Sequence, residues 1–212
     1  MKYLIFDLDG TLLNTLEDLC DSVNVVLRAN SMKERNLDEI RSFVGNGIKR
    51  LIELSVEDGT STELTNKCYE EMLAYYKEHS QIKTGPYEGV VDMLKNLKAK
   101  GKKIAVVTNK VQEAAQAVCD KYFTELIDVV IGDDKKHPLK PQPDNVYKAL
   151  DILGASKEEA VYIGDSEVDV MTAKNSGLDF VAVSWGFRER KLLEEFGVKI
   201  VDKTEELEEE LS

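Results

Sequence analysis

Six polar side chains stand where short apolar segments of the sequence end. In chain order they are Asp7, Asp9, Thr108, Lys140, Asp165 and Asp169. Parallel α/β sheets bind ligands at the carboxyl ends of their strands, so these groups are expected to meet at one edge of such a sheet. Four carboxylates that close together repel one another unless a cation neutralises them. The pattern therefore predicts a hard cation bound by oxygen ligands.

The apolar segments before these groups are typical of strands buried on both faces, because most are continuously apolar and not alternating. Helical patterns separate them, and three of these patterns are followed by a glycine at the usual stop position. The expected strands are 2–6, 103–107, 129–131, 160–163, 180–183 and 199–201, and the expected helices are 90–100, 111–122, 143–153 and 168–176. This alternation predicts a doubly wound α/β parallel sheet with right-handed crossovers.

One long stretch interrupts the alternation. Between about residues 15 and 80 the sequence has helical periodicity and no convincing strand, with apolar stripes at Leu16, Leu19, Val23, Val26 and Leu27 and at Leu64, Cys68, Met72 and Tyr75. Ser61 is a candidate N-cap for the last helix of this stretch. We therefore expect a core of residues 1–14 and 81–212 and a small all-helical domain of residues 15–80. Thr84-Gly85-Pro86 is expected to mark the return to the core.

Composition and charge narrow the range of functions. The chain has 212 residues and a formal net charge of −12, a field that repels nucleic acid and anionic membranes, so neither is expected as a partner. The apolar runs are too short to cross a bilayer, and aspartates interrupt the N-terminal run that a secretory signal needs. Three widely spaced cysteines without a CxxC pair are typical of a reduced, cytoplasmic protein. The acidic tail 205–210 is interpreted as a solvated helix face or a frayed end.

The candidate residues also carry a resemblance to a known family. Asp7-Leu8-Asp9-Gly10-Thr11, Thr108, Lys140 before Pro141, and Gly164-Asp165 with Asp169 resemble the four motifs of the haloacid dehalogenase superfamily, in the family's order and spacing. The resemblance covers essentially the whole chain, which is most similar to the phosphoglycolate phosphatase-like branch. It implies a Rossmann-like core, a helical cap formed by the insertion, and a phosphatase that uses Mg²⁺ and acts on a small phosphorylated metabolite.

The resemblance implies a chemical role for the first motif. Asp7 is expected to attack phosphorus and form an aspartyl phosphate. Asp9 is expected to protonate the leaving oxygen and then to deprotonate the water that hydrolyses the intermediate.

The residues of the remaining motifs are expected to bind the phosphoryl group and the metal ion. Thr108, with backbone N–H groups around Leu8, Asp9 and Asn109, is expected to hold the phosphoryl oxygens, and Lys140 to stabilise charge in the transition state. The expected Mg²⁺ ligands are Asp7, the Asp9 carbonyl and Asp165. Asp169 is expected either to position a metal-bound water or to orient Lys140.

Each of these residues also has an ordinary structural explanation. An aspartate after a strand, such as Asp7, is commonly a turn or capping residue. Thr108 could cap the helix that follows it, Lys140 could be a solvated loop lysine, and Asp169 could be a first-turn carboxylate favoured by the helix dipole. All of these explanations would have to hold together, and in the family's order, for the phosphatase interpretation to be wrong.

A glycine-rich loop lies inside the predicted helical domain. Gly45-Asn46-Gly47 lies between helical segments and not after a strand, which argues against a dinucleotide-binding loop. Similar loops occur at this position in phosphoglycolate phosphatase-like proteins, so Gly45, Asn46 and Lys49 are candidate substrate contacts. A plain helix–helix turn is the alternative.

Three residues after the fifth predicted strand are weaker candidates. Trp185 and Phe187 are interpreted as packing residues. Arg188 could reach a substrate carboxylate, but it is interpreted as a surface arginine.

Other activities of the same fold stay open. A β-phosphoglucomutase-like phosphomutase resembles this chain in all four motifs, and Thr11 followed by Leu12 and Leu13 favours a phosphatase only weakly. Phosphonoacetaldehyde hydrolases and haloacid dehalogenases usually lack an acid at the position of Asp9, which argues against both. The alternative outside the enzymes is a non-catalytic regulator that binds a phospho-ligand. Phosphoglycolate, sugar phosphates, nucleoside monophosphates and pyrophosphate are all open as substrates, and the protein is expected to be a monomer or homodimer.

Overall fold

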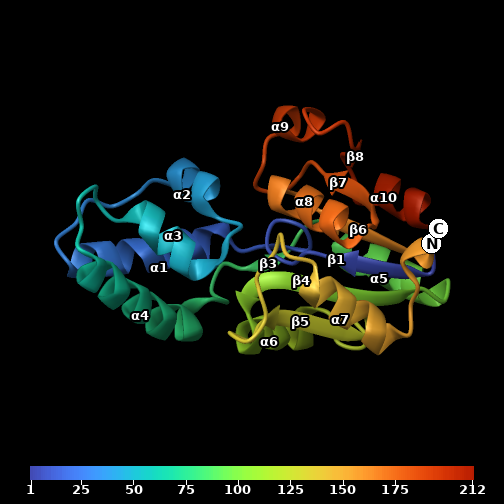
Figure 1. The fold of residues 1–212 in the computed structure, drawn as a ribbon, viewed down its shortest axis with the longest axis horizontal. Coiled ribbons are helices and arrows are strands. Elements are labelled where there is room, and N and C mark those ends of the chain that lie inside the picture. The colour runs from blue at the N-terminus through green and yellow to red at the C-terminus, as the bar shows by residue number, and fades with distance from the viewer. The chain divides into compact units, whose positions relative to one another are not determined.

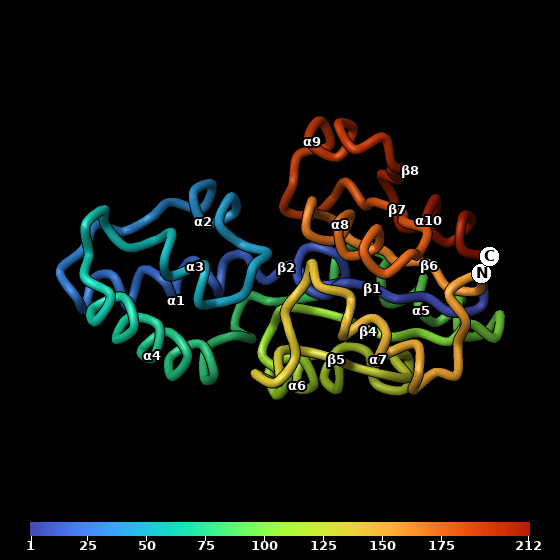
Figure 2. The backbone as a smooth tube through the Cα atoms, in the orientation of Figure 1, coloured from blue at the N-terminus to red at the C-terminus, as the bar shows by residue number.

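The computed structural model describes all of residues 1–212. It divides into two compact units, one formed by residues 1–14 together with 86–212 and the other by residues 15–85. The chain leaves the first unit after Asn14 and returns to it at Pro86, and both crossings can be followed in Figure 2. The short strands β2 (Leu13–Asn14) and β3 (Gly85–Pro86) pair in a separate two-stranded sheet, which was not predicted from the sequence.

The first unit is built on a six-stranded sheet in which all neighbouring strands are parallel. In the order β5-β4-β1-β6-β7-β8, its strands are β5 (Val129–Asp133), β4 (Lys103–Val111), β1 (Tyr3–Phe6), β6 (Ala160–Gly164), β7 (Asp179–Val183) and β8 (Lys199–Val201) (Figure 1). β1 lies at the centre, with Ile5 paired to Ala105 on one side and to Tyr162 on the other. The predicted α/β sheet is confirmed.

Helices cover both faces of this sheet. On one face, α5 (Val90–Ala99), α6 (Gln112–Tyr122) and α10 (Thr204–Leu211) form a core with Leu4 and Phe6. On the other face, α7 (Asp144–Leu153) and α8 (Glu167–Ser176) form a core with Tyr3 and Ile5. Successive residues of a strand point to opposite faces, so both faces need apolar side chains and the strands are continuously apolar. The 3-10 helix η1 (Lys157–Glu159) precedes β6, and α9 (Arg190–Glu194) precedes β8.

Two parts of this unit differ from the sequence predictions. β4 continues past the predicted end at Val107 as far as Val111, and its register against β5 shifts between those residues. Because α6 begins only at Gln112, Thr108 does not cap that helix. The acidic tail is not frayed, since α10 buries Leu207 and Leu211 in the core that it shares with α5.

The second unit is almost entirely helical, with α1 (Leu16–Ala29), α2 (Leu37–Phe43), α3 (Gly47–Ser55) and α4 (Thr62–His79). Ser61 caps α4 by accepting a hydrogen bond from the Leu64 N–H, as predicted. The buried stripe of α4 ends in Tyr76, where Tyr75 was predicted, and Tyr75 instead stacks on His79 with ring centroids 3.8 Å apart.

A buried aspartate explains why this unit extends beyond residue 80. Asp18 of α1 accepts hydrogen bonds from the backbone N–H groups of Ile82, Lys83 and Thr84. These bonds hold the segment after α4 against α1, and the chain re-enters the first unit only at Pro86.

None of the helices combines the length and the apolar sequence that a membrane span requires. Cys20, Cys68 and Cys119 are buried and form no disulfide.

Candidate active site

The carboxyl end of β1 is the topological switch point of the sheet, because the neighbours of β1 are β4 on one side and β6 on the other. Open α/β sheets bind ligands at such a point. Asp7 directly follows β1, Thr108 lies in β4, and Asp165 directly follows β6. The sheet therefore brings together residues that are far apart in the sequence.

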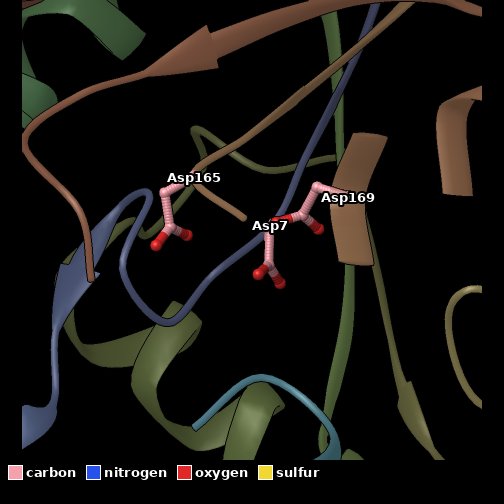
Figure 3. Close-up of side chains that lie close together, drawn as sticks. All are labelled: Asp7, Asp165 and Asp169. Carbon is pink, nitrogen blue, oxygen red and sulfur yellow. The ribbon is translucent and has the colours of Figure 1, made fainter. Parts of the chain in front are cut away.

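Three of the predicted carboxylates form one buried cluster. Asp7, Asp165 and Asp169 each place an oxygen within 4.8 Å of the others (Figure 3). Burial is the largest cause that raises the pKa of Asp7, to about 7, while Lys140 opposes the rise. Burial, followed by the charges of Asp169 and Asp7, raises the pKa of Asp165 to about 8. The crowding predicted from the sequence is thus present for three of the four carboxylates, whereas Asp9 does not belong to the cluster. This crowding favours protonated carboxyl groups unless a cation binds.

Lys140 is a buried lysine that bridges two of these carboxylates. Its Nζ lies 2.8 Å from Asp7 Oδ1 and 2.8 Å from Asp169 Oδ1. The contact with Asp169 is an aligned hydrogen bond, whereas the contact with Asp7 is an ion pair without that alignment, so Asp7 Oδ1 accepts no hydrogen bond. Burial disfavours the charge of Lys140, but Asp169 and Asp7 together outweigh it and raise the lysine pKa well above its usual value. Lys140 is therefore a fixed cation and not a solvated loop residue.

Two further residues hold Lys140 in place. The Asn109 side chain accepts from the Lys140 N–H at 2.8 Å and donates to the Lys140 carbonyl at 3.2 Å. Asn109 was predicted as a phosphate contact through its backbone, and its side chain has this different task. The Tyr162 hydroxyl lies 3.2 Å from Lys140 Nζ and 3.3 Å from Asp169 Oδ1. No role was predicted for Tyr162, because it stands inside an apolar strand segment.

Asp165 is held by groups from two other loops. Thr11 Oγ1 donates to Asp165 Oδ1 at 3.0 Å, and the Phe187 N–H donates to Asp165 Oδ2 at 2.8 Å. Gly10 has a φ of +88°, and a Cβ at this position would lie 2.4 Å from Asp165 Oδ2. Only glycine fits here, because the backbone conformation and the adjacent carboxylate both exclude a side chain.

Asp169 lies in the first turn of α8 and forms a capping box with Ser166, whose Oγ donates to Asp169 Oδ2 at 2.6 Å. Its other oxygen accepts from Lys140. Two contacts suggested by the sequence are therefore both present: Asp169 stabilises the start of α8, and it also accepts a hydrogen bond from Lys140.

Asp9 has a partner that was not predicted from the sequence. Lys110 Nζ lies 3.0 Å from Asp9 Oδ1 and 3.2 Å from Asp9 Oδ2. The Lys110 side chain is 3% exposed and that of Asp9 is 17% exposed. The one signal for this pair was the position of Lys110 two residues after Thr108, since residues two apart in a strand share a face. The predicted strand end at Val107 concealed that signal.

In the loop after β7, the structure corrects the interpretation of Arg188. Arg188 is not a surface arginine, because its side chain is only 10% exposed and its Nε and Nη2 donate to Glu167 at 2.7 and 3.1 Å. This pair ties the loop to the start of α8. Trp185 packs against the core of this unit, as interpreted, and its Nε1 also donates to the Thr11 carbonyl at 3.0 Å. Phe187 is buried, which agrees with its interpretation as a packing residue.

The remaining candidates belong to the helical unit. Gly45 lies in the loop after α2, Asn46 occupies the N-cap position of α3, and Lys49 lies in the first turn of α3. Lys49 also lines a hollow of about 520 Å³ within this unit, together with Arg35 and Arg50. A contact of these residues with substrate remains a prediction.

The carboxylate cluster fits a hard divalent cation. Its donor atoms are all oxygens, Asp7 Oδ1 accepts no hydrogen bond, and one lysine cannot neutralise three carboxylates. Mg²⁺ prefers such ligands and binds through one or two carboxylates. Buried carboxylates beside a fixed ammonium at one switch point are suited to binding a cation and an anionic group together.

Comparison with known proteins agrees with this chemistry. The family model "Haloacid dehalogenase-like hydrolase" matches residues 4–183. The phosphoglycolate phosphatase of Rhodobacter capsulatus is 37% identical over 193 residues, which cover 89% of this chain and 87% of that protein. The pyrophosphatase PpaX of Bacillus cereus is 31% identical over 198 residues, which cover 91% of this chain and 88% of that protein. A crystal structure from Lactobacillus delbrueckii subsp. bulgaricus, with a proposed phosphoglycolate phosphatase activity, matches with a TM-score of 0.94 and 35% identity over 99% of this chain and 98% of its own.

The fold and the cluster define a hydrolase core with a helical insertion, and the chain belongs to the haloacid dehalogenase-like hydrolases. Within that family it is a phosphatase of the phosphoglycolate phosphatase-like type.

The metal-free protein is expected to lose stability as the pH rises from about 4 to about 8. The pKa of Asp7 is about 7 and that of Asp165 about 8 in the folded protein, against an ordinary value of 3.8. Between these values the folded protein binds more protons than the unfolded chain, so the free energy of unfolding falls with rising pH. Mg²⁺ that bound at this cluster would bind the deprotonated carboxylates, so it should raise the melting temperature more at high pH than at low pH.

Thermal unfolding in EDTA and in Mg²⁺, at about pH 5 and about pH 8, measures this dependence. A Mg²⁺ effect of the same size at both pH values would show that the cluster does not hold the ion.

Proposed function

We propose that this phosphatase hydrolyses the phosphomonoester of a small metabolite, with Mg²⁺ as cofactor and an aspartyl phosphate on Asp7 as intermediate. The observation that carries the proposal is the buried cluster at the switch point, in which Lys140 bridges Asp7 and Asp169. A carboxylate beside a fixed cation suits a nucleophile that must approach an anionic phosphoryl group.

In the first half-reaction, an Asp7 oxygen attacks phosphorus and the bond from phosphorus to the leaving oxygen breaks. The electron pair of that bond goes to the leaving oxygen, which takes a proton from Asp9. In the second half-reaction, Asp9 removes a proton from water and the water oxygen attacks phosphorus. Asp7 then departs as a carboxylate, and inorganic phosphate is released.

The surrounding residues are proposed to bind and orient the phosphoryl group. Asn109 and Asp169 hold Lys140 before substrate arrives, so its charge needs little reorganisation during the reaction. The buried Thr108 hydroxyl is proposed to donate to a phosphoryl oxygen. Asp7, the Asp9 carbonyl and Asp165 are proposed to hold Mg²⁺, which when bound neutralises charge on the carboxylates and on the phosphoryl oxygens.

We propose that the helical unit acts as a cap that selects the substrate, with Gly45, Asn46 and Lys49 as contacts. The residues proposed for chemistry all belong to the other unit. Phosphoglycolate is the first substrate to test, because phosphoglycolate phosphatases from several bacteria match along nearly the whole chain. Pyrophosphate is the second, since PpaX matches over a similar length.

A panel of phosphorylated compounds tests the proposed function. Phosphoglycolate, pyrophosphate, sugar phosphates and nucleoside monophosphates are compared with para-nitrophenyl phosphate, in Mg²⁺ and in excess EDTA. We expect release of inorganic phosphate in Mg²⁺ only, with recovery when Mg²⁺ is added back. Lys49→Ala is expected to change the ranking of the natural compounds more than turnover of para-nitrophenyl phosphate, whereas Lys77→Ala, at an exposed position of α4, changes neither.

Full turnover in EDTA would contradict the proposed role of the metal. Transfer of the phosphoryl group to a sugar without phosphate release would instead indicate a phosphomutase. An unchanged substrate ranking in Lys49→Ala would remove this residue from the substrate contacts.

A further inference from the structure

Lys110 is a buried lysine that the reaction described above does not use. It lies in β4, and its side chain is only 3% exposed. Lysine is almost never buried to this degree unless its charge is paired. Its ion-pair partner is Asp9, with both carboxylate oxygens close to Lys110 Nζ.

The two buried lysines of this unit serve different carboxylates. Lys140 is shared between Asp7 and Asp169, and it makes no ion pair with Asp9. Lys110 forms its ion pair with Asp9. The cation that fixes the proposed nucleophile is therefore distinct from the cation that fixes the proposed acid/base.

Asp9 also differs from its neighbours in how its carboxylate is held. Asp165 accepts hydrogen bonds from Thr11 and from a backbone N–H, and Asp169 accepts from Ser166 as well as from a lysine. The Asp9 carboxylate is held by Lys110, which donates to both of its oxygens. Because one ammonium engages both oxygens, this contact determines the direction in which the carboxylate points.

We propose that Lys110 is the positioning residue for Asp9, holding its carboxylate where it can exchange a proton with the leaving oxygen. This inference rests on the proposed function, in which Asp9 is the acid/base. A general acid must lie within hydrogen-bond reach of the atom that it protonates. A misplacement of about 1 Å can lower a rate by about 10²-fold. Lys110 thus acts on the reaction through Asp9 and not through direct contact with the phosphoryl group.

The test compares Lys110→Met, which keeps the length of the side chain but removes its charge, with Lys110→Arg. The rate of leaving-group release is measured in single turnovers with an alkyl phosphate and with para-nitrophenyl phosphate. For Lys110→Met we expect a fall of about 10- to 100-fold with the alkyl phosphate and less than about 3-fold with para-nitrophenyl phosphate, because nitrophenolate leaves without a proton. Lys110→Arg should recover most of the loss.

A control variant and a binding measurement separate positioning from damage to the fold. Lys103→Met removes an exposed lysine at the other end of β4, which pairs with Asp128, and should behave as the wild type. The affinity for Mn²⁺, followed by the loss of its free electron paramagnetic resonance signal, and the KM should change by less than about twofold in Lys110→Met.

A double-mutant cycle gives the decisive result. If Lys110 acts through Asp9, the variant carrying both Asp9→Asn and Lys110→Met is no slower than Asp9→Asn alone. If the two losses multiply, Lys110 acts independently of Asp9 and the proposal is overturned. A rise in KM without leaving-group dependence would overturn it as well. Should Lys110→Met fail to fold, Lys110→Gln replaces it in the cycle.

Different experimental results would overturn the proposed function and the proposed role of Lys110. A wild-type protein that is inactive toward every phosphate ester would overturn the proposed function. An active wild type with multiplying losses would overturn only the role of Lys110.

Discussion

Asp7→Asn is expected to abolish phosphatase turnover. No other carboxylate of the cluster directly follows the central strand, and an amide oxygen is a poor nucleophile, so no covalent intermediate can form. Removal of a covalent nucleophile typically costs on the order of 10⁵-fold or more in kcat. Steady-state release of phosphate from the best substrate of the panel, and release of nitrophenolate in a single turnover, should both fall to background.

The stability of this variant is its control. Asp7→Asn relieves repulsion in the cluster, and Lys140 retains its hydrogen bond to Asp169. The metal-free variant should therefore melt no lower than the wild type at about pH 8. Residual activity within about tenfold of the wild type, in protein free of wild-type contamination, would mean that Asp7 is not the nucleophile.

Asp9→Asn is expected to separate the two half-reactions. A general acid contributes on the order of 10² to 10⁴ in rate, and it matters most for a poor leaving group. Loss of Asp9 should therefore slow aspartyl-phosphate formation severely with an alkyl phosphate and much less with para-nitrophenyl phosphate. Since the second half-reaction needs Asp9 as a base, steady-state turnover should fall with both compounds.

The kinetic signature of Asp9→Asn is a burst followed by slow turnover. Rapid mixing with para-nitrophenyl phosphate should release nitrophenolate in an amount close to one equivalent per active site. Asp7→Asn is the matched control and should show no burst. If Asp9→Asn shows neither a burst nor any dependence on the leaving group while it still binds metal, Asp9 is not the acid/base.

The sheet could be predicted because its strands must be apolar on both faces. Leu4, Ile5 and Phe6 are all fully buried, and no surface strand would carry such a run. The ends of the strands, helices and domains were harder to predict, because they depend on contacts between residues that are far apart in the sequence. The domain end predicted at residue 80 was too early, because Asp18 holds the backbone of the following residues, and no local pattern shows that contact. The turn Thr84-Gly85-Pro86 was predicted as the return to the core, and the chain does re-enter the first unit at Pro86.

The site was predictable to the extent that strand ends meet at a switch point. Asp7 and Asp165 lie together for that reason, and Asp169 joins them from the first turn of α8, the helix that follows β6. Lys140 bridges Asp7 and Asp169. Lys110 and Tyr162 were missed because their roles come from tertiary contacts. Lys110 occupies a strand that extends further than its apolar run, and Tyr162 has a hydroxyl in a segment that is otherwise apolar.

Arg188 was missed for a related reason. An arginine in a loop between secondary-structure elements is usually exposed, whereas the Arg188 side chain is only 10% exposed and pairs with Glu167, a residue 21 positions away in the sequence. Long-range pairs of this kind are the part of the site that local sequence patterns do not reveal.

Covalent phosphorylation of Asp7 is the central claim, and mass spectrometry of the acid-quenched enzyme tests it most directly. Asp9→Asn is mixed with para-nitrophenyl phosphate and Mg²⁺, quenched in acid and digested, and the peptide that contains Asp7 is analysed. Because acid keeps an acyl phosphate from rapid loss and the second half-reaction is slow in this variant, the intermediate should accumulate. We expect one phosphoryl group on Asp7 in most of the chains, and none in Asp7→Asn. A phosphoryl group on another residue, or a nitrophenolate burst without any phosphorylated peptide, would contradict the covalent role of Asp7.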